Sequence, residues 1–190
     1  MILSKYSSQR AFTLIETVVV IAFSVSVMIA LGVLIFNFTK TSAYDQALAQ
    51  SSGSATALMR EIELLTFPAD AVLQTHTFPG GIIYTSSTTT LVLEIPSIDN
   101  SGNVIATMHD YAAFYLVGTN AYRLLDKSNS SSRTAGTKQF SSTISSLSFS
   151  YNNADFTKVS TTTVDIRTQV WVKQQILSDH RNEQLRLRNH

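Results

Sequence analysis

The feature that most restricts the fold of this 190-residue chain is an apolar run near its N-terminus. From Thr17 to Phe38 the sequence contains neither a charged residue nor a proline. A helix needs about 20 such residues to span a bilayer, so the run predicts a membrane-spanning segment. One carboxylate, Glu16, lies directly before it. A carboxylate that enters lipid costs about 2–3 kcal/mol or more, so Glu16 calls for a physical explanation.

Charges on either side of the run predict its orientation. Lys5 and Arg10 precede the run without any acid among the first ten residues, and Lys40 follows it. Because cytoplasmic flanks are enriched in Lys and Arg, we expect a single-pass protein of the cytoplasmic membrane with its N-terminus in the cytoplasm. The part of the chain after Lys40 would then lie outside.

Two other interpretations of the run stay open at this point. A cleaved secretory signal would have an apolar core of about 7–15 residues that ends at a small-x-small site. This run is longer, and its small residues Ala30 and Gly32 lie inside it. A plain signal anchor that holds an outside domain would also fit the length of the run.

Composition limits the function classes. Cysteine is absent, which excludes disulfides, thiolate metal sites and cysteine nucleophiles. The net charge of +1 provides no basic field, so no nucleic-acid partner is expected.

The sequence after Lys40 predicts that the helix continues. No proline and only one glycine, Gly53, occur between Lys40 and Leu65. Apolar residues recur at spacings of three, four or seven, which indicates one buried face. The residues of this face are Leu48, Ala55, Leu58 or Met59, Ile62 and Leu65. Because Pro68 disfavours helical geometry at Phe67, the helix is expected to end near Thr66.

From Phe78 onward the hydrophobic period changes to two, which predicts β-strands. The expected strands are 88–96, 104–108, two strands within 110–126 joined by a turn at 118–120, 144–153, 161–176 and 183–189. The polar stretch Lys127–Lys138 is expected to be a flexible loop without core residues. An α+β fold follows, in which the long N-terminal helix covers the apolar face of a C-terminal antiparallel sheet.

Residues that could carry chemistry are few. The four histidines are His76, His109, His180 and His190, and no two have the i, i+4 spacing of a helical metal site. We expect His109 and Asp110 to form a surface pair at a strand edge. Asp99 and Asn103 are candidate calcium ligands, although a hairpin turn explains the same residues without a metal. No nucleophile elbow occurs, so neither a catalytic residue nor a cofactor is expected and the chain is not predicted to be an enzyme.

Glu16 has a local interpretation as a helix cap. Thr13 to Glu16 matches the pattern S/T-x-x-E before an apolar run, which is a capping box. A carboxylate in the first turn also suits the helix dipole. This interpretation is compatible with a further role for Glu16.

The string "AFTLIE" at Ala11–Glu16, with a basic leader before it and the apolar run after it, resembles the processing motif of type IV prepilins and type II secretion pseudopilins. The resemblance implies cleavage between Ala11 and Phe12 by a membrane prepilin peptidase, which also methylates Phe12. The family usually has Gly before the cut, where this chain has Ala11. Glu16 would then be the fifth mature residue and take part in subunit assembly.

The resemblance also implies a domain organisation and a function. The segments are a leader (1–11), a transmembrane and filament-core helix (12–38), an amphipathic second half of the helix (39–66) and an extracytoplasmic β-rich domain (67–190), a pilin-like layout. The implied function is a structural subunit, most like a minor pilin, of an extracellular or periplasmic filament. The implied partners are the peptidase, other pilin or pseudopilin subunits, the inner-membrane assembly platform and membrane lipid. The alternative is a membrane-anchored binding module that does not polymerise.

Overall fold

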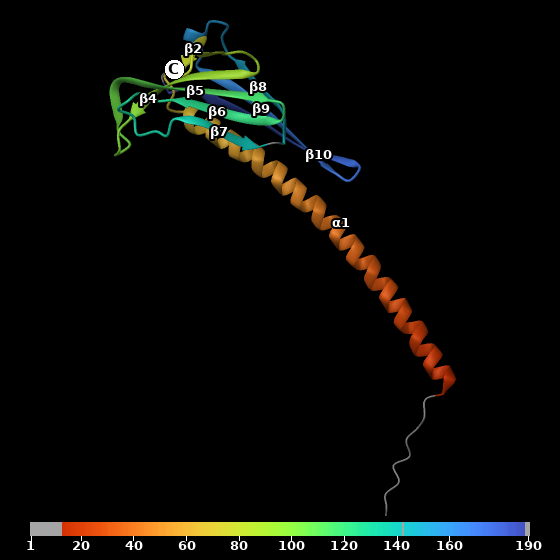
Figure 1. Cartoon of the computed structure of the whole chain (residues 1–190). Coiled ribbons are helices and arrows are strands. Elements are labelled where there is room, and N and C mark those ends of the chain that lie inside the picture. The colour runs from red at the N-terminus through yellow and green to blue at the C-terminus, as the bar shows by residue number, and fades with distance from the viewer. Residues whose placement is uncertain (1–12, 142, 189–190) are drawn as a thin grey trace, which may run out of the picture. The chain divides into compact units, whose positions relative to one another are not determined.

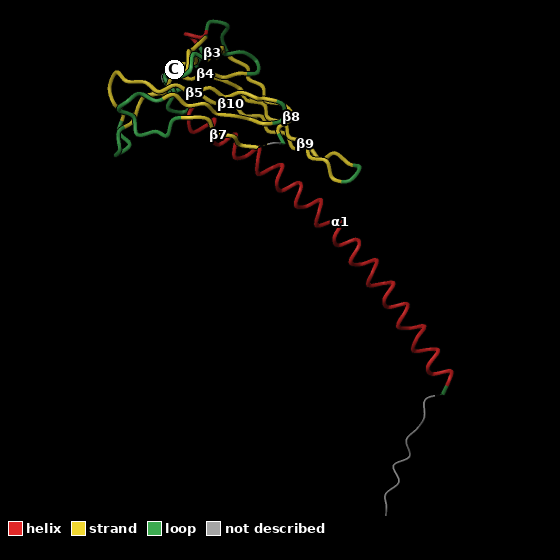
Figure 2. The backbone as a smooth tube through the Cα atoms, in the orientation of Figure 1, coloured by secondary structure: helices red, strands yellow, loops and turns green. Residues whose placement is uncertain are grey.

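The computed structural model describes residues 13–141 and 143–188, and the chain divides into two compact units, Met1–Tyr44 and Asp45–His190 (Figures 1 and 2). One α-helix, α1, begins in the first unit and ends in the second. The elements are α1 (Leu14–Thr66), β1 (Ala71–Val72), β2 (Thr75–Phe78), β3 (Ile82–Thr85), β4 (Thr90–Ile98), β5 (Val104–Val117), β6 (Asn120–Asp126), β7 (Gly136–Ser141), β8 (Ile144–Tyr151), the 3-10 helix η1 (Phe156–Lys158), β9 (Thr161–Val172) and β10 (Gln175–Arg186).

In the first unit, the described residues after Thr13 are the N-terminal part of α1, and its apolar side chains are exposed. Phe23, Met28 and Phe38 are each about 70% exposed to solvent. Within the described residues, α1 is the one helix long and apolar enough to cross a membrane, and none of its apolar window is buried. A core helix of a soluble domain would instead bury such residues. The apolar surface of this unit therefore has no cover within the unit itself.

In the second unit, α1 buries one face against strands. The buried apolar residues of α1 here are Ala47, Ala55, Leu58, Met59, Ile62 and Leu65. Most of the expected buried face is confirmed, but the prediction that Leu48 belongs to it is wrong. Leu48 is 48% exposed, and the neighbouring Ala47 is buried instead. The helix ends at Thr66, before Pro68, as expected. An α+β arrangement with the helix packed on antiparallel sheet is confirmed in these coarse terms.

Strands of the described residues form three antiparallel sheets. Their strand orders are β1-β4-β5-β6-β7, β10-β9-β8 and β2-β3. Leu91, Leu93 and Ile95 of β4 face the core under α1, as their alternation predicts. The same core includes Phe114 of β5 and Ile166 of β9, so one side of both larger sheets packs on the helix.

The other side of the five-stranded sheet is covered by the β2–β3 hairpin. Phe78 of β2 is 2% exposed and packs in a second cluster with Val92 and Ala113. Tyr84 of β3 stacks edge-on against Phe78, with ring centroids 5.5 Å apart. Strand β4 is thus apolar on both faces, and the short β2–β3 hairpin was not among the expected strands.

Two expected strand boundaries are wrong. Residues 104–108 are the start of the 14-residue strand β5 and not a separate strand, although Thr107 interrupts it with a φ of 64°. The expected strand 161–176 ends at Val172, and β10 begins at Gln175 instead of 183. The turn between them places Lys173 at a φ of 56°, a conformation that favours Gly, Asn or Asp. Neither turn residue, Lys173 or Gln174, signals a turn.

The expectation that Lys127–Lys138 is a flexible loop without buried residues is also wrong. Its last residues begin β7, and Ser131 within it is 3% exposed. The buried carboxylate of Asp110 accepts hydrogen bonds from the Ser131 hydroxyl at 2.6 Å and from the Arg133 guanidinium at 2.7 Å. A buried carboxylate needs such partners, so the polar residues of this segment hold it against the sheet.

Candidate functional site

The first candidate site is the start of α1, where Thr13 and Glu16 form a capping box. The backbone N–H of Thr13 donates to Glu16 Oε2 at 2.9 Å, and the Thr13 hydroxyl donates to the same oxygen at 3.0 Å. In return, the N–H of Glu16 donates to the Thr13 hydroxyl oxygen at 3.3 Å. These reciprocal bonds satisfy amide groups that the first helical turn leaves open. The T-x-x-E spacing predicts this geometry.

The capping box leaves the charge of Glu16 without a counter-ion inside the described part of the chain. Its hydrogen bonds there come from Thr13 alone, and Thr13 is neutral. Leu14 and Ile15 beside it are 83% and 73% exposed. A hydrogen-bonded carboxylate at the edge of an exposed apolar surface can therefore still accept a cation from outside the helix.

The residues expected at the cleavage and methylation site, Ala11 and Phe12, lie outside the described residues. No geometry can be assigned to them, and the processing expectation stays a prediction.

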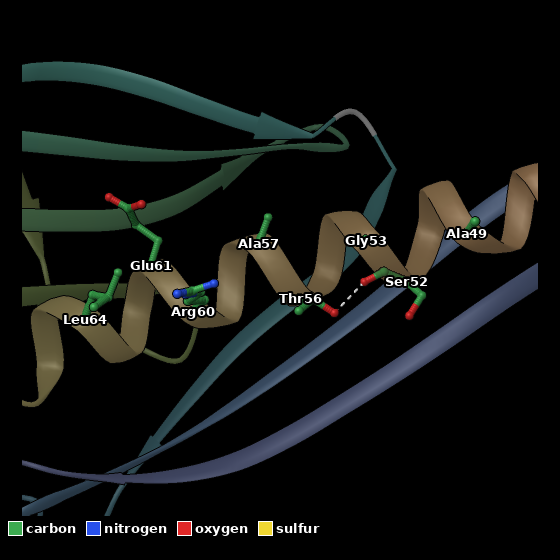
Figure 3. A pocket seen from close by; sticks show the side chains of 8 residues that line it. All are labelled: Ala49, Ser52, Gly53, Thr56, Ala57, Arg60, Glu61 and Leu64. Carbon is green, nitrogen blue, oxygen red and sulfur yellow. Dashed lines mark hydrogen bonds between the residues drawn. The ribbon is translucent and has the colours of Figure 1, made fainter.

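A second candidate site is a groove along the uncovered face of α1 in the second unit (Figure 3). Its volume is about 740 Å³, and all its lining residues belong to α1. They form two neighbouring rows with a spacing of four residues. One row is Ala49, Gly53, Ala57 and Glu61, and the other is Ser52, Thr56, Arg60 and Leu64. Such rows are the ridges between which a second helix packs in globular proteins.

Small side chains make the groove shallow and open. A Cβ atom added to Gly53 would meet no atom within 4 Å. Leu64 at one end of the groove is 60% exposed. The small residues at every fourth position could be read from the sequence, but without the fold nothing separates this face from the buried one.

Glu61 closes one side of the groove through ion pairs. Figure 3 shows its carboxylate directed toward the neighbouring strands. The Arg123 guanidinium of β6 donates to Oε1 at 2.5 Å, and the Lys138 ammonium of β7 donates to Oε2 at 2.8 Å. Glu61 and Arg123 are only 15% and 13% exposed, so this pair attaches the helix firmly to the five-stranded sheet.

On the other side of the helix, Glu63 lies beside Glu183 of β10. A hydrogen bond to Glu183, together with burial and repulsion between the two carboxylates, raises the pKa of Glu63, while the Arg60 charge opposes this shift. The pair is formed by residues far apart in the chain, and so sequence reasoning missed it. This contact brings two acidic side chains of α1 and β10 together, and their proximity disfavours the charged form of Glu63.

The histidines are dispersed. His76 stacks on Tyr111 and lies 3.4 Å from Asp126, while His180 contacts Asp165 at 2.5 Å. The expected His109–Asp110 surface pair is wrong. His109 approaches Asp70 and Glu94, whereas Asp110, its neighbour on the strand, points into the protein and is fully buried. His190 lies outside the described residues.

The candidate calcium ligands Asp99 and Asn103 form a closed turn. Asp99 Oδ1 accepts the N–H groups of Ser101 and Asn103 at 2.8 and 2.9 Å, and Oδ2 accepts the Asn103 side-chain amide. These bonds lower the pKa of Asp99, with those from Asn103 contributing most. Among the described residues, no group of three or more His, Asp or Glu side chains is placed to hold a metal ion.

Comparisons with known proteins give no family. No protein-family model matches the chain, and neither a search of curated proteins nor a search of solved structures found a match.

Proposed function

We propose that the chain is a minor pilin or pseudopilin, a structural subunit of a type IV pilus-like or type II secretion-like filament. It is made as a precursor in the cytoplasmic membrane, cut between Ala11 and Phe12 and methylated on Phe12 by a prepilin peptidase. It then enters the filament through α1. The observation that carries the proposal is an exposed apolar helix whose first turn holds one acid, Glu16, without a cation among the described residues.

The proposal gives Glu16 a partner. Cleavage would create a positive amine on Phe12, and in a bundle of helices the amine of one subunit can lie against Glu16 of its neighbour. Removing one member of such a buried pair leaves an unpaired charge, at a cost of about 3–5 kcal/mol. A subunit displaced along the bundle suffers the same cost, so the pair would also set the axial register of the subunits.

The capping box does not compete with this pairing. It uses Oε2 of Glu16, and a carboxylate has about four acceptor positions over its two oxygens. The bonds from Thr13 hold the side chain at the helix start, and among the described residues no hydrogen bond reaches Oε1, which can accept an ammonium. The cap would therefore position the charge that the neighbouring subunit needs.

The groove on the uncovered face of α1 supports a second contact between subunits. The small residues of its two rows, from Ala49 to Ala57, leave room for the ridge of a neighbouring helix. The sheet unit would remain outside the membrane, since its polar turns and ion pairs belong in water. The partners of the proposed subunit are the peptidase, other pilin or pseudopilin subunits, the assembly platform and membrane lipid.

The other candidate is a membrane-anchored module that binds a ligand outside the cell and does not polymerise. The exposed span would serve it equally well as an anchor. Such a module has no need for a new N-terminus at Phe12 or for a charge at Glu16, so the two functions differ in processing.

The mature N-terminus separates them. Mass spectrometry of the protein extracted from its native membrane should show a chain that begins at Phe12 and carries one methyl group. An intact N-terminal segment that begins at Met1 would favour the anchored module. A cut near Ala30 would instead identify a secretory signal and remove both candidates.

A further inference from the structure

We infer that the tip of the β9–β10 hairpin, residues 170–178, binds the phospholipid headgroup region of the membrane that holds α1. The inference rests on the membrane anchoring in the proposed function and adds a second contact with the bilayer, made by the sheet unit.

The hairpin tip presents an exposed aromatic and aliphatic pair. Trp171 is 68% exposed, and Ile176, its cross-strand partner in the register, is 47% exposed. Directly opposed residues of an antiparallel pair project from the same face, so the two side chains form one apolar patch. Val172 projects from the opposite face and is only 8% exposed, so that face of the tip is packed against the rest of the unit.

The tip points toward the end of the unit where the chain enters it. Arg181 of β10 donates to the Ser52 hydroxyl at 3.2 Å, and the Arg188 N–H donates to the Ala69 carbonyl at 3.3 Å. β10 therefore runs in the same direction as α1, and its start lies toward the N-terminal side of the helical segment. Figure 2 shows the hairpin extending beyond the other strands.

The lengths place the tip beyond this end of the unit. From Arg181 back to Gln175 the strand covers about 20 Å at 3.3 Å per residue. The helix from Ser52 back to Asp45 covers only about 10 Å at 1.5 Å per residue. The hairpin thus projects past Asp45, the first residue of the unit.

The chain itself keeps this end near the bilayer. The apolar run ends at Phe38, and Asp45 follows seven residues later. Even a fully extended chain spans at most about 25 Å over that length. When the run is embedded in lipid, the entry point of the sheet unit lies close to the headgroups. The hairpin tip projects from this same end of the unit, so the length of the connecting chain keeps it within reach of the interface.

The chemistry of the tip fits a lipid interface. Tryptophan is enriched at the boundary between hydrocarbon and headgroups, because its ring is apolar and its N–H needs a polar partner. Lys173 lies at the turn, and residues 170–178 contain no carboxylate. A cation beside an exposed aromatic pair favours anionic phospholipids.

Trp171 is the only tryptophan of the chain, so its fluorescence reports the tip directly. The full chain is reconstituted in vesicles of phosphatidylcholine and phosphatidylglycerol, with and without bromine on the acyl chains. We expect a shift of the emission to shorter wavelength and a loss of intensity with the brominated lipids. Emission typical of a water-exposed indole, quenched by aqueous iodide and not by bromolipid, would overturn the inference.

A matched variant controls for position. Trp171→Phe combined with Val104→Trp moves the single indole to the far end of β5, where Val104 is 52% exposed. This indole should not be quenched by bromolipid, and equal quenching at both positions would contradict a specific contact of the hairpin. Lys173→Glu should reduce the quenching of Trp171 in anionic vesicles. Lys158→Glu, at another exposed lysine, should leave it unchanged.

Two further outcomes distinguish a failure of the membrane anchoring from a failure of the hairpin contact alone. If the protein does not float with the vesicles, the anchoring in the proposed function fails together with the inference. If it floats and Trp171 stays exposed to water, the inference alone fails. A blue-shifted emission that depends on protein concentration and not on bromine would identify a second copy of the chain as the occupant, which also overturns it.

Discussion

Glu16 in the first unit and Asp110 in the second are both carboxylates in apolar surroundings, but their partners differ. Asp110 is fully buried and accepts hydrogen bonds from the hydroxyls of Ser97 and Ser131, the N–H of Ser128 and the guanidinium of Arg133. Glu16 is bonded by Thr13 alone among the described residues. The sheet unit therefore supplies a counter-ion for its own buried acid, while the described part of the helical unit, residues 13–44, supplies none for Glu16.

The same contrast holds for apolar surface. Leu58 and Ile62 of α1 are completely buried in the sheet unit, whereas Val20 and Phe36 of the same helix are more than half exposed in the first unit. One continuous helix thus belongs to two environments. The sheet unit contains its own core, whereas the apolar surface of the N-terminal part of the helix is not covered by any described residue.

The largest expected effect on folding is the difference between two fragments, one that keeps the second half of α1 and one that lacks it. A fragment beginning at Asp45 should be folded and soluble, because it keeps the whole core. A fragment beginning at Phe67 should be unfolded. It loses Leu58, Met59 and Ile62, and burial of each such side chain contributes about 1.5–3 kcal/mol to a stability of about 5–15 kcal/mol.

Circular dichroism and proteolysis of the two fragments check this pair. A mostly unfolded fragment from Asp45 would show that the sheet unit also depends on the apolar run. A folded fragment from Phe67 would show that the helix contributes little to the core.

The next largest effect is expected at Asp110. Asp110→Ala leaves Arg133, which is 13% exposed, without its counter-ion in a largely buried position. The free energy of unfolding of the fragment from Asp45 should fall by about 3–5 kcal/mol. Asp99→Ala is the control, because it removes only turn hydrogen bonds and should cost about 1 kcal/mol. Urea unfolding of both variants tests the difference, and equal losses would show that the Asp110 network does not stabilise the unit.

Asp110 also predicts a pH dependence. Burial raises its pKa, but the hydrogen bonds from Ser131, Ser128, Arg133 and Ser97 outweigh burial and lower the pKa below its usual range. The unfolded chain then takes up a proton first, near the ordinary value of about 3.9. The stabilisation is complete above that pH and is lost as the pH falls through the lower pKa of the folded state.

Unfolding of the fragment from Asp45, measured between neutral and acidic pH, tests this sign. The wild type should lose more stability on acidification than Asp110→Asn, which has no carboxylate to protonate at this position. Parallel losses in the two proteins would assign the acid sensitivity to other groups.

The sequence was informative where local rules decide the structure. Pro68 marks the end of α1, the alternation in β4 gives its core face, and the T-x-x-E spacing gives the cap at Glu16. Each of these features depends on residues within a few positions of one another. This is why the helix, most strands and the local geometry of Glu16 could be predicted.

The features that escaped prediction depend on residues far apart in the chain. Ser131 looks like a loop residue until Asp110, 21 positions away, is known to be buried beside it. The turn at Lys173 contains no glycine or asparagine, so the local sequence does not predict it. The long pairing of β9 with β10 imposes the turn instead. The groove on α1 is a property of the face that the sheets leave uncovered, which only the fold defines.

The smallest expected effect concerns that uncovered face. Gly53→Ala adds a Cβ that meets no atom within 4 Å and replaces a poor helix former by the best one. The fragment from Asp45 should therefore gain about 0.5–1 kcal/mol in free energy of unfolding. Ala55→Gly is the opposite control, since Ala55 is fully buried in the core. Thermal unfolding measures both, and a loss of stability in Gly53→Ala would mean that the groove is filled.

If Glu16 pairs with an amine of a neighbouring subunit, Glu16→Gln should break that pair. Gln also serves in a capping box, so the helix start and the cut before Phe12 should persist. Loss of the charge should weaken subunit association by about 3–5 kcal/mol, or roughly two to four powers of ten. The measurement compares wild type and Glu16→Gln in the sheared-filament fraction at matched expression. We expect a processed, membrane-resident variant that is strongly depleted from filaments, whereas equal incorporation of the two proteins would show that Glu16 has no charged partner in the filament.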